Sequence, residues 1–296
     1  MRIFVTGATG VIGAAVCREA LAQGHEVLAL KRENSISHFT KEEESKLSWV
    51  ISNSSLKNAV NAFKPDVLVH TAWGGVKAEL RNSECAQDAN FELSKELFEM
   101  YPYKQIIAMG SQAEYGYYTK RVSEDDAPHP FNSYGETKIK VCNLLKDYCE
   151  RNGIEWQWIR IFTVFGDYLR TGLIYSAAKQ SLEGATDFDT TEGTQVYAFL
   201  YAPDFAKALV KTFGAKGKSG IYNMAQPRCE VAIKDVLLKI KQITGSDINF
   251  HFGAIPFREN QVMLMSGNVD KFESAFGEIP NSDFDANLKK VIESLK

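Results

Sequence analysis

Three glycines at a fixed spacing lie close to the N-terminus and constrain the fold more than any other feature. An apolar stretch over residues 2–6 is followed directly by Gly7, Gly10 and Gly13. In a strand–turn–helix unit the first such glycine permits a tight turn and the second lets the backbone approach a pyrophosphate. The third lets the helix pack closely on the strand, and the N-terminus of the helix favours the bound anion. The pattern therefore predicts a dinucleotide-binding turn.

The rest of the first half alternates between strand-like and helix-like segments. Apolar patterning predicts strands at residues 2–6, 26–30, 66–71, 105–109 and 155–162. It predicts helices at residues 13–23, 56–63, 90–99 and 134–150. Continuous apolar strands between helices are typical of a parallel sheet that is covered on both faces. We therefore expect an α/β fold with a doubly wound parallel (Rossmann) sheet.

The pattern becomes less regular beyond residue 165. Helices are expected at 203–213 and 234–244, with short strands near 220–223 and 249–252. These elements are too few for an independent core, so we expect a smaller C-terminal α/β lobe that leans on the first. The predicted division places a dinucleotide-binding domain with the catalytic residues at 1–165. A substrate-binding lobe at 166–296 is expected to be interleaved with it.

Composition and charge exclude several classes of protein. The 296 residues carry a formal net charge of -3, whereas nucleic-acid binders are usually basic. No stretch approaches the roughly 18 consecutive apolar residues of a membrane span. The five cysteines are scattered without a C-x-x-C pair, so we expect neither a metal site nor a disulfide framework. Reduced thiols and the absence of a signal peptide predict a cytoplasmic protein.

Two cations stand at the end of the second predicted strand. A carboxylate about 20 residues beyond the glycines would hydrogen-bond a ribose 2′-hydroxyl, whereas an arginine would accept a 2′-phosphate. Here Lys31 and Arg32 follow the strand, and no carboxylate stands at its end. The sequence therefore predicts NADP as the cofactor, with NAD as the alternative.

A tyrosine and a lysine provide the predicted acid–base chemistry. Tyr134 and Lys138 are four residues apart on a predicted helix, which puts both side chains on one face. An ammonium near a phenol stabilises the phenolate, so we expect the pKa of Tyr134 to fall from its usual ~10 toward neutrality. Ser111 lies at the carboxyl end of a predicted strand, where open α/β sheets place their ligands. Its hydroxyl could hydrogen-bond a substrate carbonyl.

Several segments, taken together, carry a family resemblance. They are T-G-A-T-G-V-I-G from Thr6, V-L-V-H-T-A-W from Val67, Asn90, G-S-Q-A-E-Y-G from Gly110, Y-G-E-T-K from Tyr134, R-I-F-T-V-F-G from Arg160, A-F-L-Y-A-P-D from Ala198 and G-I-Y-N-M from Gly220. The chain resembles, over essentially its whole length, the extended short-chain dehydrogenase/reductase family. That family contains nucleotide-sugar epimerases, dehydratases and ketoreductases.

The resemblance implies a role for each matching residue. Ser111, Tyr134 and Lys138 match the family triad. Tyr134 would exchange a proton with the sugar oxygen, Ser111 would polarise that oxygen, and Lys138 would hold the nicotinamide ribose and lower the pKa of Tyr134. The implied cofactor-binding residues are Gly7, Thr9, Gly10, Val11, Ile12, Gly13, Lys31, Arg32, Ala72, Trp73, Asn90, Tyr134 and Lys138.

The residues after the catalytic serine differ from one branch of the family. The 4,6-dehydratases carry an Asp–Glu pair at the positions of Gln112 and Ala113. Neither of these side chains can eliminate water by acid–base chemistry, so a dehydratase is disfavoured. Glu114 comes one position too late to replace the missing acid, and we expect it to have a structural role.

Other departures concern the predicted diphosphate clamp. Thr163 replaces an asparagine that helps many epimerases bind the diphosphate, and Tyr197 stands where many have an arginine. Arg258 matches a late phosphate-binding arginine of the family and could compensate. We therefore expect Gln112, Thr163, Tyr197 and Arg258 to bind the substrate.

The leading hypothesis is an NADP(H)-dependent reductase of a nucleotide-linked 4-keto-(deoxy)sugar, with hydride delivered to C4 and Tyr134 as proton donor. It rests on the Lys31–Arg32 pair, on the short substrate lobe, and on Gln112–Ala113, which resembles deoxysugar synthases of the CDP-abequose and CDP-paratose type. One alternative is an NAD-dependent nucleotide-sugar 4-epimerase, and another is a non-catalytic NAD(P)-sensing protein. The resemblance also implies a homodimer that packs through the helices containing Asn90 and Tyr134.

Overall fold

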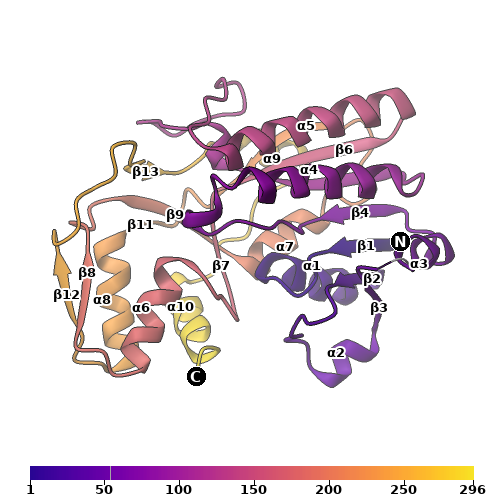
Figure 1. Ribbon diagram of the computed structural model, residues 1–296. Coiled ribbons are helices and arrows are strands. Elements are labelled where there is room, and N and C mark those ends of the chain that lie inside the picture. Colours follow the sequence, from indigo (N-terminus) through magenta and orange to yellow (C-terminus); the bar gives the residue numbers. More distant parts are fainter. Residues whose placement is uncertain (54) are drawn as a thin grey trace.

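A parallel sheet forms the larger lobe of the molecule. The computed structural model describes residues 1–53 and 55–296. The strands of this sheet are β1 (Arg2–Thr6), β2 (Glu26–Lys31), β3 (Leu47–Ile51), β4 (Val67–His70), β5 (Gln105–Ser111), β6 (Glu155–Ile161) and β10 (Gly220–Met224). In the described part of the chain the sheet has seven strands in the order β10-β6-β5-β4-β1-β2-β3, and every neighbouring pair is parallel (Figure 1). The predicted α/β class and doubly wound parallel sheet are confirmed.

Helices cover both faces of this sheet. One face carries α1 (Val11–Ala22), α7 (Ala202–Val210) and α9 (Asp270–Phe276), and the other carries α3 (Leu56–Phe63), α4 (Glu84–Glu99) and α5 (Ser133–Asn152) (Figure 1). Successive strand residues point to opposite faces. Ile3 is therefore buried with Val16 of α1 and Phe205 of α7, whereas Phe4 is buried with Leu145 of α5. Burial on both faces explains why the strands are continuously apolar.

The ends of two helices differ from the prediction because of their capping residues. Helix α4 begins at Glu84, six residues before the predicted start, because the Ser83 hydroxyl accepts a hydrogen bond from the Ala86 amide. Helix α5 begins at Ser133, and the Asn132 side chain caps it through the Gly135 amide. No helix in the described residues combines the length and the apolar character needed to span a bilayer.

The smaller lobe has a hydrophobic core of its own, so the expectation of too few elements is wrong. It contains a sheet of β7 (Thr163–Phe165), β9 (Val196–Tyr201), β11 (Glu230–Ala232) and β13 (Leu264–Met265), the pair β8 (Asp187–Thr190) and β12 (Asn249–Phe252), and helices α6 (Gly172–Leu182), α8 (Ile233–Thr244) and α10 (Phe284–Glu293). The rings of Phe165, Phe199 and Phe284 lie 5.4–6.0 Å apart in its core. The strand predicted near 249–252 is β12, whereas the other short strands of this lobe and helices α6 and α10 were not predicted because their apolar patterns are brief.

The two lobes share the chain in an interleaved way. The strand predicted near 220–223 lies in the large sheet and not in the C-terminal lobe, because β10 pairs with β6 through Tyr222 and Ile159. Helix α7 likewise lies beyond residue 165 but packs on α1. The short helix α2 (Lys41–Ser45) and the turns η1 (Ala78–Leu80) and η2 (Gln112–Glu114) belong to connections. Residue 165 as a domain boundary remains a prediction.

A fragment of residues 1–165 should fail to fold. Without β10 the strand β6 becomes an edge, and without Phe205 of α7 the apolar face of α1 around Val16 is exposed. Urea titration followed by near-ultraviolet circular dichroism should show a cooperative transition for the whole chain and none for the fragment. A sigmoidal transition of the fragment with a native-like near-ultraviolet signal would contradict the interleaving argument.

Candidate active site

The glycine turn between β1 and α1 is packed too tightly for other residues. Gly7 has a φ of +67°, and a Cβ there would lie 2.8 Å from the backbone nitrogen of Ala72. A Cβ on Gly13 would lie 2.2 Å from the carbonyl oxygen of Gly7. These two glycines let the turn approach the end of β4 and let α1 pack on the turn. The steric demands predicted from the sequence are therefore present.

The N-terminus of α1 faces the turn without a side-chain cap. Gly10 is the N-cap residue and no side chain accepts the first amides of the helix. Such amides and the helix dipole form an anion-binding site. Val11 and Ile12 are half-buried, and Gly166 from the other lobe packs against Val11, where a Cβ would lie 2.9 Å from Cγ1. The predicted cofactor-binding turn, including half-buried Thr9, thus lies at the junction of the lobes.

The cations at the end of β2 have different surroundings. The Lys31 ammonium lies 4.7 Å from the centroid of the Trp49 ring, which is a cation–π geometry. Arg32 is exposed. Neither forms a salt bridge with another described residue. Both charges therefore remain available to an anionic ligand.

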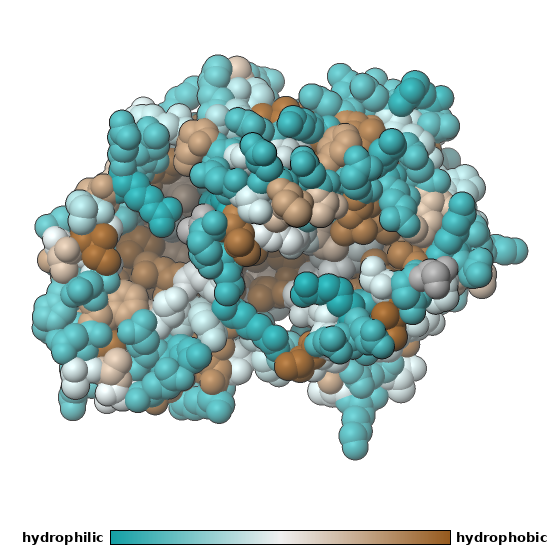
Figure 2. Space-filling view, viewed as in Figure 1, coloured by the Kyte–Doolittle hydropathy of each residue, from teal (hydrophilic) through white to brown (hydrophobic). Residues whose placement is uncertain are grey.

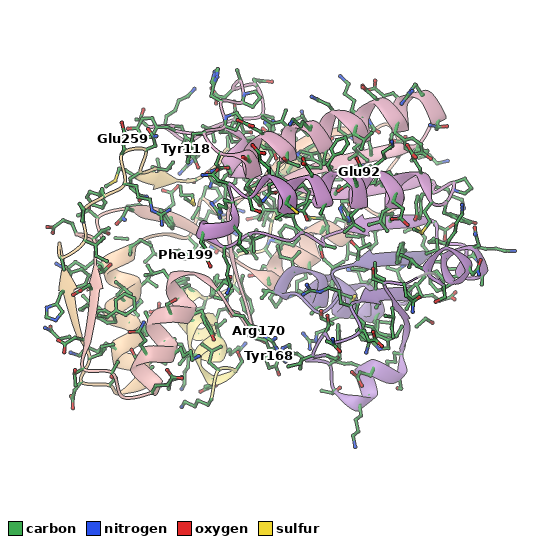
Figure 3. All side chains as sticks on the ribbon, viewed as in Figure 1. Glu92, Tyr118, Tyr168, Arg170, Phe199 and Glu259 are labelled. Atoms are coloured by element: carbon green, nitrogen blue, oxygen red, sulfur yellow. The ribbon has the colours of Figure 1, made fainter. Side chains whose placement is uncertain are left out.

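The loop that follows Lys31 and Arg32 makes a contact between the lobes. The imidazole of His38 stacks on the ring of Tyr168 with centroids 4.2 Å apart, and the Arg170 guanidinium contacts the same imidazole. Figure 3 shows Tyr168 and Arg170 together where the two lobes meet, far from Tyr118 and Glu259 at the opposite end. The loop after β7 thus reaches across to the loop after β2.

A buried polar chain holds Asn90 in place. His70 lies with one ring nitrogen 2.8 Å from the Thr6 hydroxyl and the other 3.0 Å from the Ser94 hydroxyl. Burial lowers the pKa of His70 to about 3, so the ring is neutral. Ser94 donates to the carbonyl of Asn90, and the Asn90 amide exchanges two hydrogen bonds with the backbone of Gly74. Asn90 thereby fixes the segment that follows β4.

The same segment contains Ala72 and Trp73, both half-buried. The Ala72 amide donates to the Thr6 hydroxyl at 3.2 Å, and the Trp73 indole donates to Gln87 at 3.2 Å. The Trp73 ring meets the Tyr134 ring edge-on, with centroids 6.1 Å apart. The predicted cofactor residues after β4 and the predicted catalytic tyrosine are therefore neighbours.

Ser111 ends β5 and is held by a buried ion pair. The Glu114 carboxylate is fully buried and accepts the Ser111 amide at 2.8 Å and the Arg160 Nε–H at 2.8 Å. It also accepts the Trp158 indole at 2.9 Å. The Ser111 hydroxyl in turn accepts the Ala113 amide. Glu114 thus has contacts that fit the structural role expected from the sequence, and its partner Arg160 could not be inferred from spacing.

Tyr134 and Lys138 lie on the buried face of α5. The Tyr134 amide donates to the backbone carbonyl of Arg81 at 2.9 Å. The Lys138 ammonium donates to the Met109 carbonyl at 2.6 Å and lies 3.3 Å from the centroid of the Trp73 ring. It is 5.7 Å from the centroid of the Tyr134 ring. Helical spacing therefore brings the predicted pair to one site, with the ammonium directed at Trp73 and Met109.

The expected fall of the Tyr134 pKa is not found. Burial raises the pKa of Tyr134 above its usual value, although a hydrogen bond with Ser111 and the charge of Arg81 act in the opposite direction. Burial also lowers the pKa of Lys138 to about 7, against the charge of Glu114. The sequence argument considered the lysine charge alone, whereas desolvation disfavours the charged form of both side chains.

The predicted substrate residues of the smaller lobe lie on adjacent strands. Tyr197 of β9 is opposite Met265 of β13, and Thr163 of β7 donates to the Met265 sulfur at 3.3 Å. Gln261 donates to the Tyr197 hydroxyl at 3.2 Å. Burial raises the pKa of Tyr197, and the exposed Arg258 lies close enough for its charge to lower it in part. Thr163, Tyr197 and Arg258 therefore belong to one wall.

Gln112 faces this wall from the larger lobe. It accepts a hydrogen bond from the Tyr118 hydroxyl at 3.1 Å. Burial raises the pKa of Tyr118, and Tyr197 lies near enough to add to that rise. Figure 2 shows a hollow with apolar side chains in its floor between the lobes. Sequence reasoning missed Tyr118 and Gln261 because no motif contains them, and the partner of Gln261, Tyr197, is distant in the chain.

The described residues contain no cluster of three His, Cys, Asp or Glu side chains arranged to hold a metal ion. The five cysteines are free thiols. Burial raises the pKa of Cys229 to about 11, so this half-buried thiol is not ionised near neutral pH.

Replacing Glu114 with Gln should strongly destabilise the protein. The change leaves the Arg160 guanidinium buried without its counter-charge, which costs about 3–5 kcal/mol of unfolding free energy. The matched variant Glu42→Gln breaks the exposed pair with Lys46 and should leave the unfolding free energy almost unchanged. Urea denaturation of both variants measures the difference. Equal, small losses for the two variants would show that the buried pair does not hold this loop.

Comparison with known proteins identifies the family of the chain. Residues 3–225 match the NAD dependent epimerase/dehydratase family. CDP-abequose synthase of Salmonella muenchen is 23% identical, covering 98% of this chain and 97% of that protein. UDP-glucose 4-epimerase of Lactobacillus helveticus is 25% identical, covering 86% and 84%.

Solved structures have the same fold. UDP-glucose 4-epimerase of Thermotoga maritima with UDP-glucose matches with a TM-score of 0.85 at 20% identity, over 99% of this chain and 98% of that one. UDP-glucose 4-epimerase of Thermus thermophilus with NAD matches with a TM-score of 0.86 at 20% identity, over 100% and 99%. The family match covers well over half of the sequence and includes the glycine turn, Ser111, Tyr134 and Lys138. The chain is therefore an enzyme of the NAD dependent epimerase/dehydratase family.

Proposed function

We propose that this enzyme moves a hydride to and from C4 of a nucleotide-linked sugar, with 4-epimerisation as its reaction. The observation that carries the proposal is the meeting of Ser111, Tyr134 and Lys138 at the carboxyl end of β5. The relatives support C4 chemistry, because several are 4-epimerases of UDP-glucose or UDP-glucuronate. The predicted non-catalytic sensor is not retained, since all three triad positions are filled.

The residues present fit a dinucleotide cofactor. Gly7 and Gly13 let the turn pack closely against the end of β4 and the start of α1, and the uncapped amides of α1 suit a pyrophosphate. Asn90 and Trp73 would border the nicotinamide end, and Lys138 would hold the ribose there. When bound, the nicotinamide accepts a hydride from the sugar and returns it.

The acid–base work falls to Tyr134. As phenolate it removes the proton of the C4 hydroxyl while a carbonyl forms at C4, and it returns that proton when the hydroxyl is restored. Ser111 donates a hydrogen bond to the same oxygen. The proton is thus taken and given back by one group, so epimerisation needs no net change of protonation.

The substrate would lie across both lobes. Arg258 is an exposed cation beside Tyr197, and it would bind the diphosphate. Gln112 and Thr163 would contact the sugar from opposite lobes. The nucleotide sugars in the solved relatives, UDP-glucose and UDP-glucuronic acid, define the first substrates to test.

An NADP(H)-dependent 4-ketoreductase is the second candidate. Lys31 and Arg32 favour it, because free cations at the end of β2 suit a 2′-phosphate. The similarity to CDP-abequose synthase over nearly the whole chain supports it too. The homodimer through α4 and α5 and the cytoplasmic location both stay predictions.

The nucleotide released from the denatured, purified enzyme should discriminate the two candidates. An epimerase returns its hydride to the same sugar and keeps its cofactor, so we expect about one NAD per chain. Chromatography of the released nucleotides measures this. Release of NADP, or an empty enzyme that oxidises added NADPH with a 4-keto-6-deoxy sugar nucleotide, would replace the epimerase proposal by the reductase.

Tyr134→Phe should abolish turnover and leave cofactor binding unchanged. Loss of the general base lowers kcat by roughly 10²–10⁴-fold. Conversion of UDP-glucose, UDP-glucuronic acid and a panel of CDP-, dTDP- and GDP-linked sugars is followed by product analysis. Tyr148→Phe, on the same helix but away from the site, is the matched control. Undiminished turnover by the Tyr134 variant would refute the mechanism, and a wild-type enzyme inert on every sugar nucleotide would refute the substrate class.

A further inference from the structure

A second cation lies against the predicted catalytic tyrosine. The guanidinium carbon of Arg81 is 5.1 Å from the centroid of the Tyr134 ring. Arg81 follows the turn η1 and is half-buried. The family resemblance gives this position no role. The contact therefore calls for a physical explanation.

Hydrogen bonds fix both partners of this contact. The Arg81 carbonyl accepts the Tyr134 amide at 2.9 Å, while the Arg81 Nε–H donates to the Val76 carbonyl at 3.1 Å. The Asn82 side chain accepts the Ser133 amide at 3.3 Å. The loop is thus docked on the first turn of α5, and the guanidinium is held in one orientation over the ring.

Among the described residues, no carboxylate forms an ion pair with the Arg81 guanidinium. Arg81 forms no salt bridge with another described residue. A surface arginine that only anchored a loop would commonly be paired with a carboxylate. Here the guanidinium lies against the ring of Tyr134, and a phenolate would attract the cation more strongly than a phenol.

Lys138 is poorly placed to stabilise a phenolate at Tyr134. Its ammonium is engaged by the Met109 carbonyl and the Trp73 ring, and burial lowers its pKa to about 7. The lysine is therefore partly neutral near neutral pH. A guanidinium stays protonated at every physiological pH. Arg81 is the permanent cation beside Tyr134.

We propose that Arg81 is a positioning residue that holds the Tyr134 ring in place and stabilises its phenolate, sharing the role that the family pattern gives to Lys138. The inference rests on the proposed function, in which Tyr134 is the acid–base group. It adds to that function a residue from the loop after β4, which lies outside the Y-x-x-x-K motif.

The first test is the pH dependence of kcat/KM for Arg81→Gln and Arg81→Lys. The rise of kcat/KM with pH reports the ionisation of Tyr134. Removing a charge at this distance should raise the pKa of that ionisation by about one pH unit or more, so kcat/KM below that pKa falls roughly tenfold. High pH should restore the rate of the Gln variant, and the Lys variant should keep the wild-type pKa. Arg151→Gln, which removes a charge from the far end of α5, is the matched control.

The proposal is overturned if the pKa read from the pH profile of kcat/KM is the same in Arg81→Gln as in the wild type, however much the rate itself falls. A purely structural role lowers the rate equally at all pH values and leaves that pKa unmoved. The proposal is also overturned if Arg81→Lys and Arg81→Gln give the same pKa in their pH profiles, because the charge at this position would then not matter. Should the Gln variant fail to fold, Arg81→Met, which keeps the apolar stem, replaces it.

A second measurement needs no substrate. Tyrosinate absorbance is titrated with pH in the wild type and in Tyr134→Phe, and the difference between the two curves isolates the ionisation of Tyr134. The same pair of curves is then measured with Arg81→Gln added to both proteins. We expect Tyr134 to ionise at higher pH without Arg81. If the Tyr134 titration is unchanged without Arg81, the proposed role of Arg81 is refuted even when turnover is normal. If the titration shifts but the enzyme converts none of the sugar nucleotides, only the proposed function is refuted.

Discussion

All seven strands of the large sheet run in one direction, and the site depends on this constraint. Parallel pairing of β1 with β4 and of β4 with β5 brings their carboxyl ends to one edge. The glycine turn after Thr6, the segment after His70 and the loop after Ser111 therefore meet, although up to 105 residues separate them in the sequence. The Thr6 hydroxyl accepts the Ala72 amide and is hydrogen-bonded to the His70 ring, and these contacts join two of the strand ends directly. The edge is a rigid frame on which the helices place the reacting groups.

Burial decides how the ionisable groups at this edge behave. Three donors satisfy the carboxylate oxygens of Glu114 in the interior, and one of them is the backbone amide of Ser111, which Glu114 thereby fixes. Tyr134 and Lys138 are also buried, and desolvation moves their pKa values apart, that of the tyrosine upward and that of the lysine downward. Nearby charges oppose both shifts, Arg81 for Tyr134 and Glu114 for Lys138, and such interactions strengthen where water is excluded.

The smaller lobe is tied to this edge by more than the chain connection. Gly166 packs on Val11 at the start of α1, and Tyr168 stacks on His38. These contacts join the lobes where the predicted phosphate-binding turn lies, whereas Tyr197 and Arg258 approach from the other end. One lobe thus supplies the chemistry and both supply the walls.

The sequence by itself determined the features that depend on local physics. Gly7 and Gly13 were recognisable because a tight turn and close helix packing exclude every other residue, and Tyr134 and Lys138 because helical spacing puts them on one face. Only the tertiary structure decided the rest. The pairing of Glu114 with Arg160, the place of β10 beside β6, the meeting of Thr163 and Tyr197 in one wall and the contact of Arg81 with Tyr134 join residues far apart in the chain. The pKa values followed the same division, because desolvation is a property of the packed interior and no spacing of residues encodes it.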